Sequence, residues 1–331
     1  MLDEWICLDF VVIRNAIRGS EDRFRLANGE SMGKLEIRHG ETAKHLFEAI
    51  TVPAKRGSVN FFWLGQAGFA VRSSTSLLLI DVYLSNALAD KYRDAEFKHR
   101  RMMPTPLVPD EVRGVDLLLA SHAHSDHLDP GSVGQIMALN PDCRLICPGS
   151  VVPRALERGA DRDRIISMPE LEKCRFGPVI IEMIPSAHET LERDADGSAL
   201  FAGFVIEIDG VRFYHSGDCV PYGGLAELLK ERRIDLALLP VNGRDAIRTA
   251  AGILGNFTVD EAAELCIEAG IPILIPHHFG MFDFNTISPE KIENALEKYR
   301  GRDLEWIIPE SGYCLTAAGM GAVPVAAATG D

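Results

Sequence analysis

The sequence predicts an α/β (α+β) fold in which two β-sheets lie between layers of helices. Many short apolar segments separated by Gly and Ser turns come early in the chain, as is typical of strands joined in hairpins. Amphipathic helical segments then alternate with later strands. This order of elements is consistent with two sheets that are covered by helices. With 331 residues, of which 47% are hydrophobic, the chain can bury a sizeable core.

The expected strands begin after Ser58. Three apolar runs bounded by turn residues, Val59–Leu64, Gly68–Val71 and Leu77–Ile80, are typical of short strands. The later strand candidates are Val115–Ala120, Arg144–Cys147, Val179–Ile184, Gly203–Ile208, Val211–His215, Leu236–Leu239 and Ile271–Ile275.

Helices are expected between the later strands. Thr258-Val259-Asp260-Glu261 is a capping box, and the apolar residues that follow it share one helical face before Gly270. Ser288-Pro289 is typical of a second helix start. Apolar periodicity predicts further helices near Val133–Met137, Leu225–Leu229 and Glu41–Ile50.

These patterns divide the chain into three regions. Residues 1–55 are mixed and charged, and we expect an N-terminal extension that packs on the core or on a neighbouring subunit of a homo-oligomer. Residues 56–316 would form the main domain. The Ala/Gly-rich residues 317–331 would form a flexible C-terminal tail.

Composition narrows the range of partners. A net charge of −14 argues against nucleic acid, but it permits a small anionic substrate that meets a local basic patch. No apolar segment approaches the roughly 20 residues of a membrane helix, and the N-terminus lacks the positive flank of a secretory signal. The seven cysteines are scattered without C-x-x-C spacing. We therefore expect a soluble cytoplasmic protein without a membrane partner.

One segment is rich in metal-ligating side chains. Ala120–Asp129 holds three histidines and two aspartates in ten residues, directly after an apolar run. His122 and His124 lie two apart on extended chain, so both can meet one ion, whereas Asp126 and His127 on the following turn can reach a second. The alternative is a solvated loop that happens to be rich in histidine.

His122–His127 matches the H-x-H-x-D-H signature and resembles the metallo-β-lactamase superfamily. Four further segments resemble motifs of that superfamily in the right order: Trp63–Phe69 with its "WLG" strand, Pro185–His188, Tyr214–Asp218 with its "SGD", and Pro276–Gly280 with its "H-x-G". The resemblance covers residues 58 to about 315. It implies the metallo-β-lactamase fold, a four-layer αββα sandwich, here with an N-terminal extension.

The resemblance also implies a site for two divalent metal ions. His122, His124 and His188 would hold one ion, Asp126, His127 and His278 the other, and Asp218 would bridge them. Imidazole and carboxylate without thiolate suit zinc or manganese, and iron also fits.

Further residues would support these ligands. His277 is expected to pack beside the site, although either ring of the His277–His278 pair could coordinate. Asp81 and Asp129 are candidates to accept the second N–H of a metal-bound histidine. The alternative for Asp81 is a simple turn residue at a strand end.

Within the superfamily, the resemblance points to the L-ascorbate-6-phosphate lactonase branch. This implies a metal-dependent hydrolase in which a metal-bridged hydroxide opens a lactone of a phosphorylated or acidic sugar, with Asp126 carrying a proton to the leaving oxygen. Two alternatives remain. One is a phosphodiesterase, because N-acyl-phosphatidylethanolamine phospholipase D shares the motif set, and the other is a non-catalytic metal-binding scaffold.

Two loops contain basic residues that could bind an anionic substrate. Lys91-Tyr92-Arg93 and Lys98-His99-Arg100-Arg101 form a basic island in an acidic chain, and Arg100 and Arg101 are its candidate substrate ligands. Arg244 and Arg248, after the Leu236–Pro240 strand, are the alternative anion ligands. A solvated or subunit-contact loop is the competing interpretation of the basic island.

Overall fold

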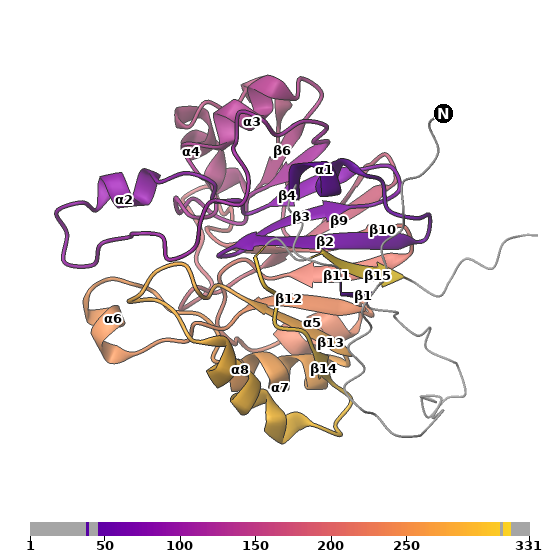
Figure 1. The fold of residues 1–331 in the computed structure, drawn as a ribbon, viewed down its shortest axis with the longest axis vertical. Coiled ribbons are helices and arrows are strands. Elements are labelled where there is room, and N and C mark those ends of the chain that lie inside the picture. The colour runs from indigo at the N-terminus through magenta and orange to yellow at the C-terminus, as the bar shows by residue number, and fades with distance from the viewer. Residues whose placement is uncertain (1–37, 40–45, 312–313, 319–331) are drawn as a thin grey trace, which may run out of the picture.

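The structure, a computed structural model, describes residues 38–39, 46–311 and 314–318, and its strands form two sheets (Figure 1). The first sheet, in spatial order, contains β1 (Arg38–His39), β15 (Cys314–Ala318), β2 (Ser58–Gly65), β3 (Gly68–Arg72), β4 (Leu77–Ile80), β5 (Leu117–Leu119), β6 (Arg144–Cys147) and β7 (Ile165–Ser167). The second contains β14 (Glu305–Trp306), β13 (Ile273–His277), β12 (Leu236–Pro240), β11 (Val211–His215), β10 (Ala202–Ile208), β9 (Val179–Pro185) and β8 (Lys173–Phe176).

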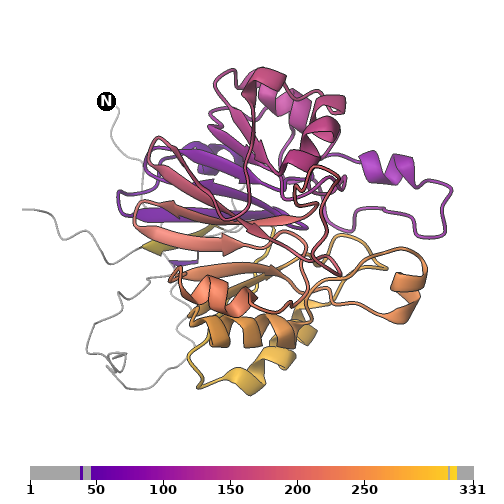
Figure 2. The same ribbon diagram turned by 180° about the vertical axis from the view of Figure 1, so that it is seen from behind.

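Helices cover the outer face of each sheet (Figures 1 and 2). On the first sheet these are α1 (Leu46–Thr51), α3 (Val133–Leu139) and α4 (Val152–Glu157), and on the second α5 (Leu225–Lys230), α7 (Val259–Ala269) and α8 (Pro289–Leu296). Two short helices, α2 (Ala87–Lys91) and α6 (Ala246–Ala250), project away from the sheets. The expected αββα sandwich is confirmed.

The strands of the first sheet are apolar on both faces because both faces are covered. In β2, Phe61 and Trp63 belong to the cluster that fills the space between the sheets, whereas Phe62 and Leu64 belong to the cluster under α1 and α3. Alternate residues of a strand point to opposite faces, so an uninterrupted apolar run serves two cores at once.

An aromatic pair joins the two sheets. Phe61 of β2 and Phe213 of β11 meet edge to face, with ring centroids 4.9 Å apart, and both side chains are almost completely buried. Such edge-to-face geometry adds to the stabilisation that comes from burial alone.

The structure differs from the sequence predictions at the ends of elements, and it also contains elements that the sequence did not predict, including β7, β8, β14, β15, α2, α4 and α6. The strand expected at Ile271–Ile275 begins at Ile273, because the N–H of Ile271 bonds the carbonyl of Cys266 to close α7 and Pro272 has no N–H to donate. β15 pairs with β2 as far as Ala318, so Ala317 and Ala318 belong to the sheet and not to the expected tail. Of the expected N-terminal extension, residues 1–37 and 40–45 lie outside the described residues.

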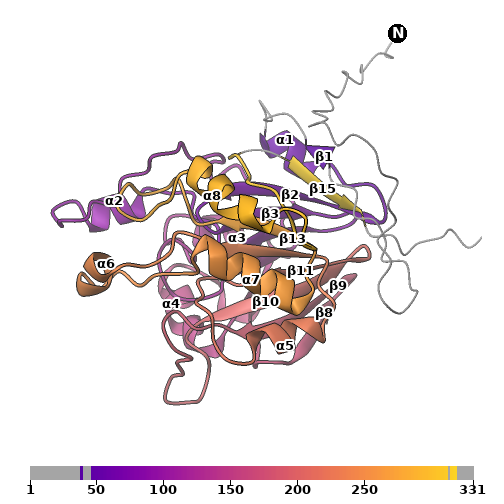
Figure 3. The same ribbon diagram turned by 90° about the horizontal axis from the view of Figure 1, so that it is seen from below.

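Parallel pairing brings several strand ends to one edge. β4 and β5 are parallel in the first sheet, and β11, β12 and β13 are parallel in the second. The carboxyl ends of parallel strands share one edge, where α/β proteins commonly bind ligands. The segments carrying α2 and α6 follow β4 and β12, and both project from the same side of the molecule (Figure 3). Among the described residues, no helix has the length and apolar composition needed to cross a membrane.

Candidate metal centre

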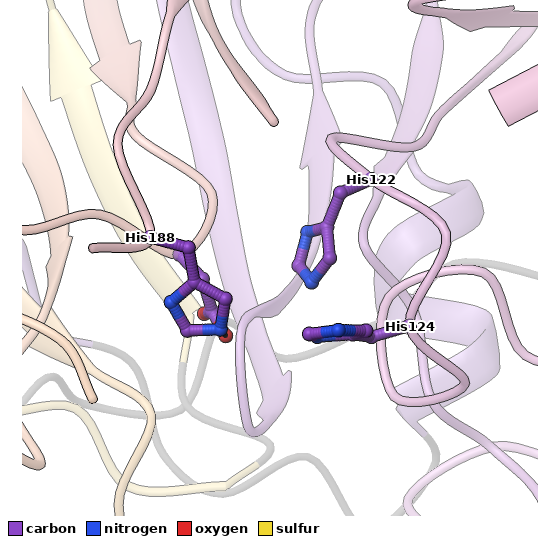
Figure 4. A group of neighbouring side chains, drawn as sticks. His122, His124 and His188 are labelled. Atoms are coloured by element: carbon purple, nitrogen blue, oxygen red, sulfur yellow. Dashed lines mark ion pairs between the residues drawn. The ribbon is translucent and has the colours of Figure 1, made fainter. Parts of the chain in front are cut away.

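Seven acidic and imidazole side chains gather at this edge in two groups. The first contains His122, His124, His188 and Asp218, and the second contains Asp126, His127 and His278. Within each group, the atoms that could bind a metal all lie within 4.8 Å of one another. Figure 4 shows the rings of His122 and His124 facing the ring of His188 across a shared space. The structure therefore brings together all seven residues that the resemblance implies as metal ligands.

Asp218 lies between the two groups. Its Oδ1 atom is 3.2 Å from Nε2 of His127 and 3.3 Å from Nε2 of His278, both in the second group. Its Oδ2 atom is 3.5 Å from Nε2 of His188 in the first group. The two oxygens of one carboxylate thus face different groups, as a bridging ligand requires.

The donor atoms fit divalent metal ions. Nε2 of His122, Nε2 of His127 and Oδ1 of Asp218 are buried, and none makes a hydrogen bond within the described part of the chain. Buried polar atoms without partners are costly, and a metal ion supplies the missing partner. Imidazole nitrogen and carboxylate oxygen suit zinc, manganese or iron, so the residues present fit the group that the resemblance implies.

Protonation favours metal binding at the first group. Burial lowers the pKa of His188 to about 4 and that of His122 well below its ordinary value, so both rings are neutral at pH 7. Burial alone would raise the pKa of Asp218, but His127 and His278 hold it well below its ordinary value. Neutral imidazoles and an ionised carboxylate are the forms that bind a metal.

Asp81 orients a ligand of the second group. It directly follows β4, and its Oδ2 atom lies 2.8 Å from Nδ1 of His127. Its Oδ1 atom accepts the backbone N–H of Ser121 at 2.7 Å. A carboxylate in this position accepts the Nδ1 proton and leaves Nε2 of His127 for the metal.

Asp81→Asn is expected to weaken metal binding by about 10–100-fold, the usual cost of losing such an orienting contact. An amide can donate to Nδ1 of His127, which favours the tautomer that carries its proton on Nε2. The measurement is zinc affinity by competition with a chromophoric chelator. Asp116→Asn is the control, because Asp116 accepts the N–H of Leu77 at the start of β4. Equal affinities in both variants would contradict this role of Asp81.

Gln66 is a site residue that the sequence analysis missed. Its Nε2 atom donates to Oδ2 of Asp126 at 2.8 Å and lies 3.1 Å from Nε2 of His278. The carbonyl of Gln66 also accepts the backbone N–H of His278 at 2.9 Å. Both residues have a positive φ, 52° for Gln66 and 63° for His278, a conformation that is uncommon outside glycine and is often kept at functional sites.

Two other missed residues shape the H-x-H-x-D-H turn. Arg158, which follows α4, donates to the carbonyls of His124 and Leu128 and to Oγ of Ser125. Phe201 packs against the rings of three ligands, His122, His124 and His188, at centroid distances of 5.1, 5.8 and 5.1 Å. Arg158 and Phe201 belong to no recognisable sequence motif, because each is a single residue of its type in a loop.

The remaining supporting residues take different positions. His277 is fully buried and stacks on His215 with ring centroids 5.0 Å apart, beside the ligand group and not within it. Asp129 accepts hydrogen bonds from the N–H groups of Leu84 and Gly131 and from the hydroxyls of Ser85 and Ser132, and none joins it to a histidine within the described residues. The prediction that Asp129 orients a metal ligand is therefore wrong, because this carboxylate ties together two loops.

The expected substrate arginines are largely committed to other partners. Arg244 forms two hydrogen bonds with Glu261, at 2.6 and 2.7 Å, and a third with the carbonyl of Asn256. Arg101 donates to the carbonyls of Tyr83 and Met103. Arg100 is exposed and lines an open hollow of ≈ 400 Å³ on the loop that carries α2.

Two sheets between helices, with histidines and aspartates gathered in two groups at one edge, define a protein of the metallo-β-lactamase type. The chain belongs to the beta-lactamase superfamily, because the model of the family described as "Beta-lactamase superfamily domain" matches residues 78–279, more than half of the chain. The superfamily assignment made from the motifs is confirmed.

Known proteins resemble the chain over most of its length. An Aeropyrum pernix protein named UPF0173 metal-dependent hydrolase is 28% identical over 252 residues, which cover 71% of this chain and 88% of that protein. The solved structure of Igni18, described as a novel metallo hydrolase from Ignicoccus hospitalis, is 18% identical, covers 78% of this chain and 98% of that chain, and has a TM-score of 0.56. An isothiocyanate hydrolase from Delia radicum gut bacteria is 15% identical, covers 78% and 100%, and has a TM-score of 0.63.

These comparisons support the general class of metal-dependent hydrolases, but they do not support one branch of the superfamily over another. The names of the curated relatives support a metal-dependent hydrolase. The two solved structures are too distant in sequence to show more than the fold. The L-ascorbate-6-phosphate lactonase branch is not confirmed by these relatives.

Proposed function

We propose that the chain is a hydrolase dependent on two divalent metal ions, and that it opens a lactone of a phosphorylated or acidic sugar. One observation carries the hydrolase proposal: seven donor side chains form two groups that share Asp218. Such an arrangement suits two adjacent cations, and every ligand position that the superfamily motif implies is occupied by a suitable residue.

The chain's own residues account for orientation and proton transfer. Bound divalent cations would polarise the substrate's oxygen and lower the pKa of water. The side chain of Asp126 is 17% exposed, against 5% for Asp218, so it is the more accessible carboxylate of the two. Desolvation raises the pKa of Asp126, but His127, His278 and His124 together lower it below its ordinary value, which keeps the carboxyl ionised. Gln66 fixes its orientation. Asp126 would therefore accept the proton of the attacking water and pass it to the leaving oxygen.

An anionic substrate is proposed from the basic residues of the α2 loop. Desolvation lowers the pKa of His124, and the positive charge of Lys91 adds to that lowering, which supports a position of Lys91 near the ligands. Lys91 and Arg100 are both exposed. Because Arg101 and Arg244 already have partners, we propose Lys91 and Arg100 as the residues that meet the substrate's anionic group.

Phosphodiester hydrolysis is the second candidate. Two ligand groups joined by one carboxylate are also the arrangement with which two-metal enzymes clamp the attacking and leaving oxygens of a phosphoester. The same site geometry therefore serves either reaction, and the substrate loops decide between them.

Parallel assays separate these functions. Purified protein is analysed for bound metal, then assayed with acidic and phosphorylated sugar lactones and with bis(p-nitrophenyl) phosphate. We expect lactone turnover that EDTA abolishes and that added zinc or manganese restores. Turnover of the diester alone would replace the lactonase proposal by the phosphodiesterase. If the metal-loaded protein hydrolyses neither substrate class, the result would contradict the hydrolase proposal and favour a metal-binding scaffold.

A further inference from the structure

Three buried asparagines form a hydrogen-bonded chain behind the first ligand group. Oδ1 of Asn256 accepts the backbone N–H of Cys219 at 2.9 Å, and Nδ2 of Asn256 donates to Oδ1 of Asn242 at 3.0 Å. Nδ2 of Asn242 donates in turn to Oδ1 of Asn285 at 2.7 Å. The exposed fractions of Asn256, Asn242 and Asn285 are 0%, 4% and 8%. The three residues, called the amide chain below, come from three separate loops.

Both ends of the amide chain are held by groups that can only donate. At one end the donor is the backbone N–H of Cys219, and at the other Nη1 of Arg248 donates to Oδ1 of Asn285 at 2.6 Å. Arg248 is itself held by Asp245 and by the carbonyl of Asn242. The orientation of each amide therefore follows from its neighbours, and no flipped arrangement satisfies every member.

The amide chain ends beside two ligands of the same group. Cys219 directly follows Asp218, so the bond to Asn256 holds the backbone next to that carboxylate. Gly255, which precedes Asn256, accepts the Nδ1 proton of His188 at 3.1 Å through its carbonyl. The segment Gly255–Asn256 thus contacts both Asp218's loop and the ring of His188.

Close packing keeps this segment in place. A Cβ atom on Gly255 would lie 2.1 Å from Cβ of Arg244 and 2.8 Å from the carbonyl oxygen of Gly243, so only glycine fits there. The N–H of Gly243 also bonds the carbonyl of Phe257 at 3.0 Å. The loop that leads into α6 is therefore packed tightly against the residues that hold His188 and Asp218.

We propose that Asn256 is a positioning residue that holds Asp218 and His188 in the geometry for their metal, and that Asn242, Asn285 and Arg248 extend this support to the loop carrying α6. The inference rests on the proposed function, because it assumes that the first ligand group binds a metal. Within the described residues, the side chains of the amide chain and Arg248 make no hydrogen bond to an atom that could bind the metal, so their effect passes through Asp218 and His188.

The test measures zinc affinity in a background in which the second ligand group is incomplete. The background is His278→Ala, which removes a ligand of the second group and keeps His122, His124, His188 and Asp218. In this background, Asn256→Ala is expected to weaken zinc binding by about 10–100-fold, as for other residues that orient metal ligands. Zinc affinity is measured by competition with a chromophoric chelator, and thermal unfolding of the metal-free protein is recorded for each variant.

Two matched controls separate positioning from general destabilisation. Asn140 is also buried, at 5% exposure, and bonds Val115, Val112 and Ile136, so Asn140→Ala should lower the stability without weakening zinc binding. At Asn285, both bonds of the chain use the side-chain oxygen as acceptor. Asn285→Asp keeps an acceptor and should retain zinc affinity, whereas the similarly sized Asn285→Leu should lose part of it.

Each outcome decides between the possibilities. Zinc affinity that falls in Asn256→Ala and Asn285→Leu but not in Asn140→Ala or Asn285→Asp supports the amide chain. Unchanged affinity in Asn256→Ala, or an equal loss in Asn140→Ala, overturns it while leaving the hydrolase intact. Native protein that takes up no zinc, manganese or iron at all overturns the proposed function as well.

Discussion

Asp218→Asn is expected to reduce hydrolysis by several orders of magnitude while the chain remains folded. The carboxylate presents one oxygen to His127 and His278 and the other to His188. An asparagine has the same shape but only one oxygen, so its NH₂ group must face one of the two ligand groups. That group then loses an anionic ligand and gains a donor that repels a cation. The measurements are kcat with the substrate that the native protein hydrolyses, and metal content per chain.

The control for this variant is Asp235→Asn. Asp235 lies just before β12, where its Oδ2 atom accepts the backbone N–H of Arg212 at 2.7 Å. It is a carboxylate at the opposite end of the same sheet, so its loss should leave both metal content and kcat unchanged. Near-native activity in Asp218→Asn with a native circular dichroism spectrum would contradict a bridging role for this residue.

The ligand set could be predicted because the motifs that resemble the superfamily follow recognisable strands. His122, Asp218 and His278 each follow an apolar strand within three residues, and both the apolar runs and the polar bursts are visible in the sequence. Parallel pairing then brings those strand ends to one edge of the sandwich. The local pattern and the topology therefore agree with the ligand set that the resemblance to the superfamily implies.

Contacts between distant loops could not be predicted in the same way. Glu261 is recognisable as the third helical residue of a capping box, and it does bond the N–H of Thr258. The same carboxylate also pairs with Arg244, which removes that arginine from the set of available anion ligands. A sequence shows that a charge is present but not which partner it meets after folding. Gln66 could not be predicted as a site residue for a related reason, because a single amide side chain in a turn has no distinctive sequence pattern.

Short edge strands were another part of the fold that the sequence did not predict. β8 contains Lys173 and Arg175, and its residues are half-buried or exposed, so it lacks the apolar run of a central strand. β7 is three residues long, and β14 is two. Such strands form because a neighbouring strand offers unpaired backbone groups, and that cause lies outside their own sequence.

Phe213→Ala is expected to lower the free energy of unfolding by about 3–5 kcal/mol, the usual cost of removing a buried phenylalanine side chain. The ring is fully buried between the sheets, and its edge-to-face contact with Phe61 joins β11 to β2. Neighbouring side chains that belong to two rigid sheets can move little, so a cavity would remain. Urea unfolding of the metal-free protein, followed by far-UV circular dichroism, gives the difference.

A double-mutant cycle with Phe61→Ala separates the aromatic contact from simple burial. If the edge-to-face pair contributes, the two single losses should exceed the loss in the double variant by about 0.5–1.5 kcal/mol. Strictly additive losses would show that the rings contribute only through buried area.

Because β11 leads to Asp218, metal that binds only the folded chain should also shift the unfolding midpoint of Phe213→Ala upward. A midpoint insensitive to added zinc would show that loosening this sheet contact has disconnected β11 from the metal centre.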